Sequence, residues 1–413
     1  MSEYRTRTDC RLCRSHNLHK VFDLAPTPPA NAFVDKSALD TKQTCYPLDV
    51  YQCGDCAHVQ LRTVINPDIL FKNYVYVSGT SPVFVKHFDD YAQQLIAHYA
   101  LSQDDLVVDI GSNDGTLLNA FKTRGLSVLG IDPATAIANK ATADGIDTWP
   151  EFFNETTVRR ILECKSKPKL ICANNVFAHT DGLIEFVKNV KQLLADDGIF
   201  VFEVSYLVDV YENTLFDMTY HEHLAYHSVI PLQKLFHSEG LELIDTQSIN
   251  THGGSLRGIV QHQGGPHTQT PRVAEFIANE KTLKLDHVET LQRFGDNIDQ
   301  IKQQLNTKLR ALKAQGKKII GYGAPAKATT LMYHFGLDAS ILDFIVDDSP
   351  LKQHLYTPGL HIPVLPSSAI AEHKPDYILI LAWNFADSII EKNKHLYDLG
   401  CQFITPLPIV ETR

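Results

Sequence analysis

Four cysteines near the start of the chain form two pairs with the spacing of metal ligands. They stand in the segments Cys10-Arg-Leu-Cys13 and Cys53-Gly-Asp-Cys56. Each Cys-x-x-Cys segment places two thiolates on one tight turn, and two such turns complete a tetrahedron around Zn²⁺. Because four thiolates leave no open position on the metal, we expect a structural zinc site and not a catalytic one.

The segment between the two cysteine pairs bears on the same site. It is not basic, which argues against a zinc ribbon that binds nucleic acid. Pro26, Pro28 and Pro29 predict an irregular chain that wraps over the next domain. Cys45 is expected to be a small core residue, although Cys45 or His58 could replace one of the four zinc ligands.

A histidine-rich stretch carries the densest chemistry, with Tyr220, His221, Glu222 and His223 side by side and His227 close behind. An imidazole titrates near neutral pH and an adjacent carboxylate tunes its proton affinity, so this stretch can supply a general base. A metal site is the alternative, but no second histidine lies four residues after His221, and Glu222 precedes the His223–His227 pair. A histidine buried in the core is the third interpretation.

Residues 106–133 predict the element that would position a nucleoside. A short apolar strand leads into a turn that contains Gly111, Asn113 and Gly115, a helix follows, and a second apolar strand ends at Asp132. This is half of a doubly wound sheet. The glycines let the backbone approach a ligand, the helix N-terminus offers N–H groups, and Asp132 can accept both ribose hydroxyls.

The composition of this turn discriminates between two ligands. The dinucleotide pattern is GxGxxG, and Asn113 occupies the place of its second glycine. A pyrophosphate requires that glycine for close approach, whereas S-adenosylmethionine (SAM) has no phosphate. The form DIGSNDG therefore resembles the first motif of class I SAM-dependent methyltransferases more than a NAD site. An α/β domain with an unused turn is the remaining interpretation.

The next part of the chain predicts further strands of the same sheet. An apolar strand at residues 170–173 ends in the polar residues Asn174 and Asn175, with His179 shortly after. Active groups gather at the carboxyl ends of strands in this fold, so we expect these residues where substrate and cofactor meet. Phe153 is a candidate apolar contact for the adenine.

A hydroxyl-rich segment precedes the nucleoside unit. Tyr74, Tyr76 and Ser78 lie in the sequence NYVYVSGTS. Such residues can line a sugar pocket by stacking and hydrogen bonding. The two tyrosines could equally alternate along a strand and pack into the core.

A second α/β unit begins near residue 317. Gly321, Tyr322 and Gly323 lie at a strand end and turn, and Lys327 follows at the expected start of a helix. A glycine turn with a nearby lysine suits a phosphate or pyrophosphate, although a tight core turn would have the same composition. Residues 271–315 repeat apolar positions at three- and four-residue steps, which predicts one long helix linking two lobes.

Composition excludes several classes of protein. The chain has 413 residues, 44% hydrophobic and 21% charged residues, and a net charge of −10. The acidic balance argues against a nucleic-acid or membrane-surface binder, and no apolar run approaches the roughly 20 residues of a membrane span. The N-terminus has no apolar signal core, so we expect a cytoplasmic protein with free thiols and metal sites.

Taken together, the motifs CxxC…CxxC, YxYxS, DIGSNDGTLL, ANNVFAH, YHEH and GYGAPAK resemble the SAM-dependent nucleotide-sugar C-methyltransferases. The resemblance is to enzymes that act on dTDP-linked or similarly activated 4-keto-deoxysugars, and it covers nearly the whole chain. It implies a zinc-binding domain over residues 1–70, a SAM-binding Rossmann-like domain over 71–270, and a second Rossmann-like α/β domain over 271–413. The last domain would help to hold the nucleotide sugar.

The resemblance also implies roles for individual residues. The family's base matches His223, with Glu222 as its neighbour and Tyr220 nearby, while His179 and Tyr76 match other pocket positions. A base would remove the acidic C3 hydrogen beside the C4 ketone, and a hydrogen-bond donor would stabilise the enolate oxygen. His221 is the alternative base. Cofactor contacts are expected from Gly111, Asn113, Gly115, Asp132, Phe153 and Asn175, and substrate contacts from Tyr74, Ser78, Gly321, Tyr322, Gly323 and Lys327.

The sequence thus predicts an α/β enzyme that transfers a methyl group from SAM to C3 of a dTDP- or GDP-linked 4-keto-deoxyhexose. It is expected to bind structural Zn²⁺ and to be a monomer or a weak dimer, without nucleic-acid or membrane partners. The alternatives are a nucleotide-sugar O- or N-methyltransferase, a zinc-bearing NAD-dependent sugar oxidoreductase, and a non-catalytic binding protein.

Overall fold

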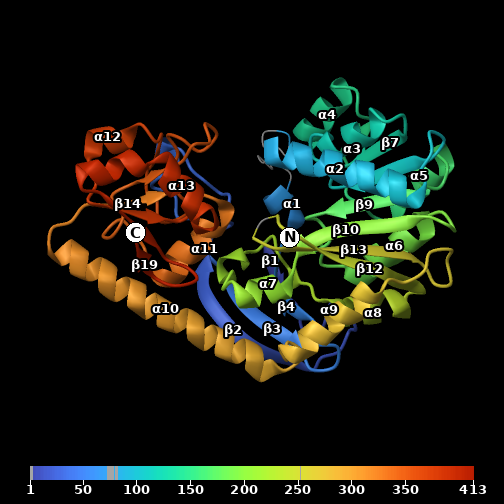
Figure 1. The fold of residues 1–413 in the computed structure, drawn as a ribbon, viewed down its shortest axis with the longest axis horizontal. Helices are drawn as coiled ribbons and strands as arrows, with labels where there is room; N and C mark the ends of the chain where they lie inside the picture. The colour runs from blue at the N-terminus through green and yellow to red at the C-terminus, as the bar shows by residue number, and fades with distance from the viewer. Residues whose placement is uncertain (1–2, 72–78, 80–81, 252) are drawn as a thin grey trace.

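The computed structural model describes residues 3–71, 79, 82–251 and 253–413. Two lobes stand side by side above a curved sheet near the N-terminus, and a long helix runs beneath them (Figure 1). One lobe is the central α/β domain and the other is the C-terminal α/β domain. The three-part architecture expected from the sequence is therefore present.

The N-terminal module is built on a four-stranded antiparallel sheet in the order β11-β4-β3-β2 and a two-stranded sheet, β1-β5. The segment between the cysteine pairs is less irregular than its prolines predict, because β2 and β3 form a long hairpin. Pro26 lies in β2 where the register shifts between Leu24 and Thr27, which is where a sheet tolerates proline. The elements are β1 (Tyr4–Thr6), β2 (Leu18–Thr27), η1 (Lys36–Ala38), β3 (Tyr46–Cys53), β4 (Val59–Leu61), β5 (Thr63–Ile65), α1 (Pro67–Phe71) and β11 (Ala225–Tyr226).

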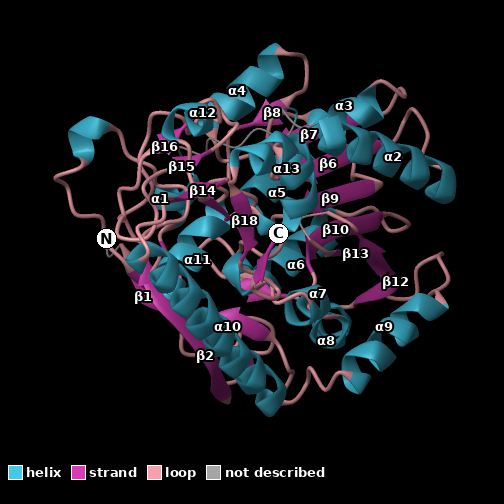
Figure 2. Ribbon diagram, turned by 60° about the vertical axis from the view of Figure 1, so that its left-hand side comes forward, coloured by secondary structure: helices cyan, strands magenta, loops and turns pink. Residues whose placement is uncertain are grey.

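The central domain has a seven-stranded sheet in the order β12-β13-β10-β9-β6-β7-β8. Its strands stand in one row in Figure 2. The pairs among β8, β7, β6, β9 and β10 are parallel, and β13 runs antiparallel between β10 and β12. The strands are β6 (Leu106–Ile110), β7 (Ser127–Ile131), β8 (Thr148–Trp149), β9 (Leu170–Asn174), β10 (Ile199–Ser205), β12 (Leu241–Ile249) and β13 (Ser255–His262).

Alternation along the strands separates the two faces of this sheet. Val107 and Cys172 pack against α2 and α3, whereas Val108 and Ile171 pack in the larger core that contains α5, α6 and α8. The helices are α2 (Pro82–Tyr99), α3 (Thr116–Lys122), α4 (Thr135–Ala143), α5 (Glu155–Cys164), α6 (Leu183–Leu193), α7 (Leu207–Glu212), η3 (Phe216–Met218) and α8 (Val229–Ser238).

The prediction of a single helix over residues 271–315 is wrong, because the helical region is interrupted. The structure has two helices, α9 (Pro271–Thr282) and α10 (Val288–Ala314). Lys284 between them adopts a φ of 56°, a left-handed conformation that ends a helix. The Leu285 carbonyl accepts a hydrogen bond of 2.6 Å from the Gln52 side chain. The break therefore lets α10 turn and pack along β2.

The C-terminal domain has a six-stranded sheet in the order β16-β15-β14-β17-β18-β19, parallel except for the last pair. Strand order reverses direction between β14 and β17, which is where open α/β sheets bind ligands. Its elements are β14 (Ile319–Tyr322), α11 (Ala326–Phe335), β15 (Ile345–Val346), β16 (Val364–Leu365), α12 (Ala369–His373), β17 (Tyr377–Ile380), η4 (Trp383–Phe385), α13 (Ala386–Lys392), η5 (Lys394–Leu399), β18 (Gln402–Thr405) and β19 (Glu411–Thr412).

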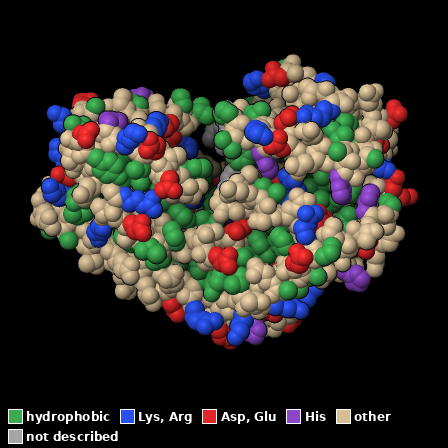
Figure 3. Space-filling view, viewed as in Figure 1, with side chains coloured by type: hydrophobic (Ala, Val, Ile, Leu, Met, Phe, Trp, Pro, Cys, Tyr) green, Lys and Arg blue, Asp and Glu red, His purple; other side chains and the backbone are tan. Residues whose placement is uncertain are grey.

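The surface is notched between the two lobes (Figure 3). Below the notch one continuous apolar core joins the N-terminal sheet, the central sheet and α10 and α11. Within the described part of the chain, none of the helices has the length and apolar character needed to cross a membrane. The arrangement brings the carboxyl ends of the central strands toward the C-terminal domain, which is where an α/β fold places its functional site.

Candidate functional site

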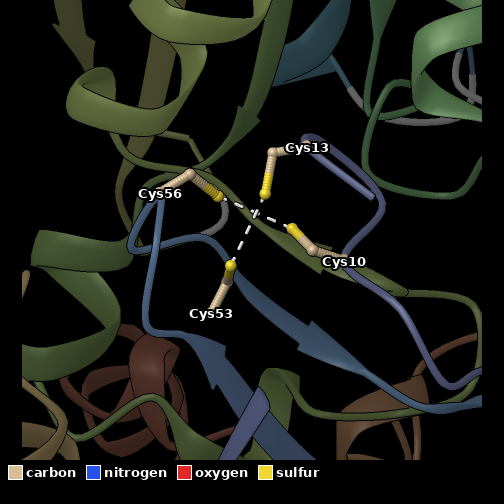
Figure 4. Close-up of side chains that lie close together, drawn as sticks. All are labelled: Cys10, Cys13, Cys53 and Cys56. Atoms are coloured by element: carbon tan, nitrogen blue, oxygen red, sulfur yellow. Dashed lines mark hydrogen bonds between the residues drawn. The ribbon is translucent and has the colours of Figure 1, made fainter. Parts of the chain in front are cut away.

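The four predicted zinc ligands converge on one centre (Figure 4). The sulfur atoms of Cys10, Cys13, Cys53 and Cys56 all lie within 4.8 Å of one another. The Cys10–Cys56 and Cys13–Cys53 sulfur distances are 3.5 and 3.6 Å. Four thiol sulfurs at these separations fit a tetrahedral Zn²⁺ site with no open position.

The two cysteine turns share one backbone geometry. In the first, the Arg14 N–H donates to the Cys10 carbonyl at 3.0 Å, and in the second the Ala57 N–H donates to the Cys53 carbonyl at 2.9 Å. Arg14 and Ala57 both adopt a left-handed φ, of 62° and 69°. Hydrogen bonds from the Cys10 and Cys56 thiols lower the pKa of Cys53, which favours the thiolate that a metal binds.

Neither alternative zinc ligand joins this cluster. Cys45 is exposed and its sulfur is 3.9 Å from the Tyr333 hydroxyl, so its predicted place in the core is wrong. His58 is buried, with its ring 5.7 Å from the ring of His227. Among the residues that the structure describes, the four cysteines form the one group with metal-ligand spacing, so the histidine-rich stretch is not a metal site there.

The predicted nucleoside turn lies between β6 and α3. Gly111 and Gly115 adopt positive φ values of 72° and 76°. A Cβ at Gly111 would lie 2.2 Å from a methyl carbon of Val176, so only glycine fits between this turn and the loop after β9. Gly115 immediately precedes α3, whose first N–H groups face the turn.

Asp132 fixes this turn from the end of β7. One carboxylate oxygen accepts the Asn113 N–H at 2.8 Å and the other accepts the Ala134 N–H at 2.8 Å. Burial raises the pKa of Asp132, and these two N–H groups act in the opposite direction. Each carboxylate oxygen keeps a second lone pair, which is the acceptor that a ribose hydroxyl needs.

Asp109 is a buried acid that the sequence prediction did not include. It lies in β6, two residues before Gly111, and burial together with the charge of Asp132 raises its pKa well above the usual range. The signal was present in the sequence, because a carboxylate in an otherwise apolar strand LVVDI costs free energy unless a partner compensates it.

The polar residues predicted after β9 lie at the carboxyl edge of the sheet. The Asn175 N–H donates to the Glu203 carbonyl of β10 at 2.7 Å, and Asn175 has a φ of 56°. Both side-chain polar atoms of Asn174 are buried, and none of the residues that the structure describes forms a hydrogen bond with them. Phe153, predicted to contact adenine, packs edge-on against Phe186 at a ring distance of 5.1 Å.

Four aromatic side chains lie against one another at this edge. The ring of His179 is stacked on the ring of His223, with 5.1 Å between the ring centres. The ring of Tyr220 also packs against His223, with 4.0 Å between the ring centres. Phe71 stacks on His179 at 5.8 Å. Two segments far apart in sequence thus bring the predicted pocket residues together.

Hydrogen bonds define the state of the two imidazoles. Nδ1 of His223 is 2.8 Å from the Met218 carbonyl, which can only accept, so Nδ1 carries a proton and the lone pair of the neutral ring lies on Nε2. Nε2 of His179 is buried, and within the described part of the chain it has no hydrogen-bond partner. Burial, with a smaller effect of His223, lowers the pKa of His179 well below its usual value, so this ring is neutral.

The other two histidines of the stretch face away from this stack. Nε2 of His221 is 3.2 Å from the Tyr46 carbonyl of β3, and burial lowers the pKa of His221 to about 4. The ring of His227 stacks on Phe177 at 5.0 Å in the core, and burial lowers its pKa to about 4. These two residues therefore belong to the packing between the N-terminal module and the central domain.

Glu222 has a partner from the proline-rich loop. The Asn31 side-chain amide donates to a Glu222 carboxylate oxygen at 3.1 Å. Asn31 comes directly after the prolines that predicted a chain wrapping over the next domain, and this part of that prediction is confirmed. The amide partner itself could not be foreseen, because the two residues are 191 positions apart.

Lys327 lies in a buried contact between the domains. Its ammonium is 3.6 Å from the Asp217 carboxylate and 4.3 Å from the centre of the Trp383 ring, and the Trp383 indole N–H donates to Asp217 at 2.7 Å. Burial lowers the pKa of Lys327 and raises that of Asp217. The ammonium thus faces a carboxylate of the protein, which differs from the predicted place beside a phosphate.

The C-terminal glycine turn is tightly packed. A Cβ at Gly321 would lie 2.9 Å from Ile345, and one at Gly323, whose φ is 88°, would lie 2.5 Å from Ala382. Tyr322 is buried inside β14. Sterics therefore already account for both glycines, as the alternative of a tight core turn proposed. A pocket of about 540 Å³ lies at the ends of β17 and β18, with Trp383 in its lining.

Tyr74, Tyr76 and Ser78 lie outside the described residues, so their predicted roles stay predictions.

Three family models match consecutive parts of the chain. They describe a zinc-binding domain over residues 10–71, a methyltransferase domain over 84–246, and a C-methyltransferase C-terminal domain over 250–408. Together with the glycine turn and Asp132, they define a SAM-dependent methyltransferase with a four-cysteine zinc site.

A full-length relative identifies the kind of methyltransferase. The chain is 34% identical over 400 residues to the C-methyltransferase NovU of Streptomyces niveus, and the match covers 97% of this chain and 95% of that protein. The chain therefore belongs to the SAM-dependent C-methyltransferases that combine an N-terminal zinc-binding domain with a C-terminal C-methyltransferase domain. This assignment excludes the NAD-dependent oxidoreductase and the non-catalytic binding protein.

Solved structures match a smaller part of the chain. Magnesium protoporphyrin IX methyltransferase of Synechocystis PCC 6803, solved with bound SAM, is 14% identical, with 43% of this chain and 79% of that chain covered and a TM-score of 0.33. A SAM-dependent methyltransferase of Clostridium acetobutylicum is also 14% identical, with 44% and 92% covered and a TM-score of 0.36.

Proposed function

We propose that this C-methyltransferase methylates C3 of a nucleotide-activated 4-keto-deoxyhexose, with His223 as the base. The observation that carries the proposal is the stack of His179, His223 and Tyr220 at the carboxyl edge of the SAM-binding sheet. A carbon next to a ketone is acidic enough for an imidazole to deprotonate it when the enolate oxygen is stabilised. Neither the family models nor the relative's name specifies the sugar.

His223 suits the role of base because of its tautomer. Its Nδ1–H donates to the Met218 carbonyl at 2.8 Å, so Nε2 carries the lone pair that takes the proton. The neighbouring Glu222 carboxylate, held by Asn31, favours the imidazolium that forms. Orientation by a carbonyl and stabilisation by a carboxylate are the two requirements for a histidine base.

His179 and Tyr220 suit the stabilisation of the enolate. Burial keeps His179 neutral, so one ring nitrogen carries a hydrogen, and its buried Nε2 has no hydrogen-bond partner among the described residues. A donor in a water-poor site is most effective when it points to the oxygen on which charge develops. We assign the C4 oxygen to His179 and Tyr220, with Tyr76 as a further candidate.

The steps conserve atoms and electrons. The C3–H bond breaks, its proton goes to Nε2 of His223, and its electron pair moves onto the C4 oxygen. When bound, SAM would supply a methyl group on a positively charged sulfur, and the carbon of that methyl group would accept the C3 nucleophile in line with the leaving sulfur. The C3–CH3 bond forms as the S–CH3 bond breaks, and S-adenosylhomocysteine leaves with a neutral sulfur. The residues of this chain supply the base, the oxyanion donors and the positioning.

We assign the cofactor to the turn between β6 and α3. Gly111, Asn113 and Gly115 supply backbone close to the nucleoside, and Asp132 accepts the ribose hydroxyls. We add Asp109 to these cofactor contacts. Its buried carboxyl group suits the positively charged amino-acid end of SAM, because that charge would compensate the cost of burying the carboxylate. Phe153 and Asn175 remain candidates for the adenine and the methionine end.

The nucleotide end of the substrate is assigned to the C-terminal domain, near the turn at Gly323 and the pocket lined by Trp383. Open α/β sheets bind ligands where the strand order reverses, and these residues lie at the ends of β14 and β17. Because Lys327 is paired with Asp217, we assign this lysine to the domain interface and not to the pyrophosphate.

The test is methyl transfer from SAM to a panel of dTDP- and GDP-linked 4-keto-6-deoxysugars in deuterated water. We expect one product heavier by a methyl group, and deuterium at C3 of recovered substrate. His223→Gln should lower kcat by about 10²- to 10⁴-fold and abolish the exchange. His221→Gln is the matched control, because His221 points into the N-terminal sheet.

The outcomes separate the alternatives. A methylated sugar without exchange at C3 would indicate an O- or N-methyltransferase. Full turnover by His223→Gln, or loss of exchange in His221→Gln alone, would refute His223 as the base.

A further inference from the structure

Asp181 ties the loop that carries His179 to the N-terminal module. It lies two residues after His179, and three arginines of the module, Arg5, Arg7 and Arg11, pair with its carboxylate. Nη1 of Arg7 donates to the Asp181 backbone carbonyl at 3.0 Å and contacts its carboxylate at 3.1 Å. Nε of Arg11 lies 3.1 Å from the same carboxylate oxygen.

This cluster is not an ordinary surface ion pair. The side chains of Arg11 and Arg7 are 0% and 4% exposed, and that of Asp181 is 17% exposed. Exposed ion pairs are weak and mobile, whereas a buried guanidinium keeps its planar hydrogen-bonding geometry. Arg7 contacts both the backbone and the side chain of Asp181, so it restrains the main chain of the loop as well as a charge.

The position of Arg11 is set by the zinc-binding turns. Arg11 lies between Cys10 and Cys13, and its N–H donates to the Gln60 side chain at 2.9 Å. The amide of Gln60 in turn donates to the Asp9 carbonyl at 3.0 Å. The cysteine turn and Gln60 therefore position the backbone from which the Arg11 side chain reaches Asp181.

The same frame also holds the segment of His223. The Leu61 N–H of β4 donates to the Leu224 carbonyl at 3.0 Å, directly after His223, and β4 pairs with β11. The Leu224 N–H then donates to the Ala178 carbonyl, one residue before His179, at 3.0 Å. Both histidine segments are thus attached to one small module.

We propose that Asp181 is a positioning residue for methyl transfer: through Arg7 and Arg11 it fixes the loop of His179 to the zinc-binding module and so holds His179 against His223. This inference rests on the proposed function. The histidines lie in irregular segments, and their rings are stacked at 5.1 Å. A displacement of about 1 Å in such a site costs about 100-fold in rate.

The experiment compares Asp181→Asn with Asp9→Asn in the full chain. Asp9 is the matched control, because it pairs with the same Arg7 at 2.9 Å and loses the same charge, but it is remote in sequence from both histidines. We measure kcat and KM for the sugar, bound zinc by native mass spectrometry, SAM affinity by calorimetry, and hydrogen exchange of peptides from residues 175–182.

For Asp181→Asn we expect kcat to fall about 10- to 100-fold, with KM, zinc content and SAM affinity within about twofold of the starting protein. The peptides of residues 175–182 should lose protection from exchange. Asp9→Asn should retain kcat and protection. Unchanged kcat in zinc-loaded Asp181→Asn, or an equal fall in Asp9→Asn, would overturn the inference.

Asp181→Glu covers the case in which the asparagine variant does not fold. It keeps the charge for Arg11 and moves the carboxylate by one methylene, so the fold should survive while kcat falls; unchanged kcat would again overturn the inference. If the unaltered enzyme methylates no sugar, the proposed function fails, and the exchange of residues 175–182 still tests whether Asp181 fixes the loop.

Discussion

The ion pair between Lys327 and Asp217 joins the C-terminal domain to the segment that holds His223. The two side chains are 8% and 0% exposed, and Asp217 directly precedes Met218, whose carbonyl accepts from His223. Lys327→Met removes the ammonium and keeps an apolar chain of similar length. The Asp217 carboxylate then keeps the hydrogen bond from the Trp383 indole N–H.

The magnitude follows from the geometry. Two unit charges 3.6 Å apart attract by about 5 kcal/mol at an effective dielectric constant of 20. Desolvation of both ions offsets much of this, but removing one partner leaves the other buried, which costs about 3–5 kcal/mol. Burial already raises the pKa of Asp217, and loss of Lys327 raises it further. A carboxyl group whose pKa is higher in the folded than in the unfolded chain destabilises the fold at pH values above the unfolded pKa. The free energy of unfolding of the variant should therefore be lower at pH 8 than at pH 5.

The assay uses the tryptophans, of which the chain has two. In a Trp149→Phe background, the fluorescence of Trp383 reports on the domain interface during urea unfolding. We expect Lys327→Met to lower the free energy of unfolding by about 3–5 kcal/mol, and Asp217→Asn with Lys327→Met to recover at least about 1 kcal/mol of it. A double-mutant cycle with zero coupling between the two residues would refute this reasoning.

Three further expectations rest on other contacts. Cys13→Ser should release the zinc in native mass spectrometry and lower the melting temperature, whereas Cys45→Ser, at an exposed thiol outside the cluster, should keep both. Asn31→Ala removes the amide that contacts Glu222 at 3.1 Å, a charge-assisted bond of about 1.5–3 kcal/mol, and should lower kcat without loss of zinc. Burial lowers the folded pKa of His227 to about 4, so the unfolded chain binds its proton first as pH falls below about 6.5; His227→Gln should reduce the stability lost between pH 6.5 and 4 by about 3 kcal/mol in urea unfolding. A pH dependence identical to that of the starting protein would contradict the last point.

Local features of the fold were predictable because they depend on neighbours in sequence. The strand, turn, helix and strand of residues 106–133 are present, since apolar runs and glycines determine them over short distances. The four-cysteine zinc site was equally predictable, because the spacing of the two ligands in each pair depends on a single turn. The break at Lys284 was not, because a left-handed lysine carries no glycine or proline signal.

The contacts that distinguish the histidines from one another could not be predicted from the sequence. His221 and His223 stand on either side of one residue, yet one faces the Tyr46 carbonyl of the N-terminal sheet and the other the Met218 carbonyl. The direction in which each imidazole points depends on tertiary packing. The local sequence pattern therefore could not decide whether His221 or His223 is the base. The ion pair of Lys327 could not be foreseen for the same reason, because its partner Asp217 lies in another domain.

The arrangement of three domains follows from where the chemistry sits. His179 and His223 lie in loops that no helix or strand of the central domain contains, and a loop alone cannot hold two rings in fixed stacking. The N-terminal module contacts the two histidine segments through Asp181 and through the pairing of β4 with β11. The C-terminal domain contacts the segment that precedes His223, since the Thr330 hydroxyl donates to the Thr219 carbonyl at 2.8 Å and Lys327 holds Asp217. The proposed mechanism requires a base and an oxyanion donor in fixed relation, so we expect each flanking domain to contribute to the geometry of the site even where it does not contact the substrate.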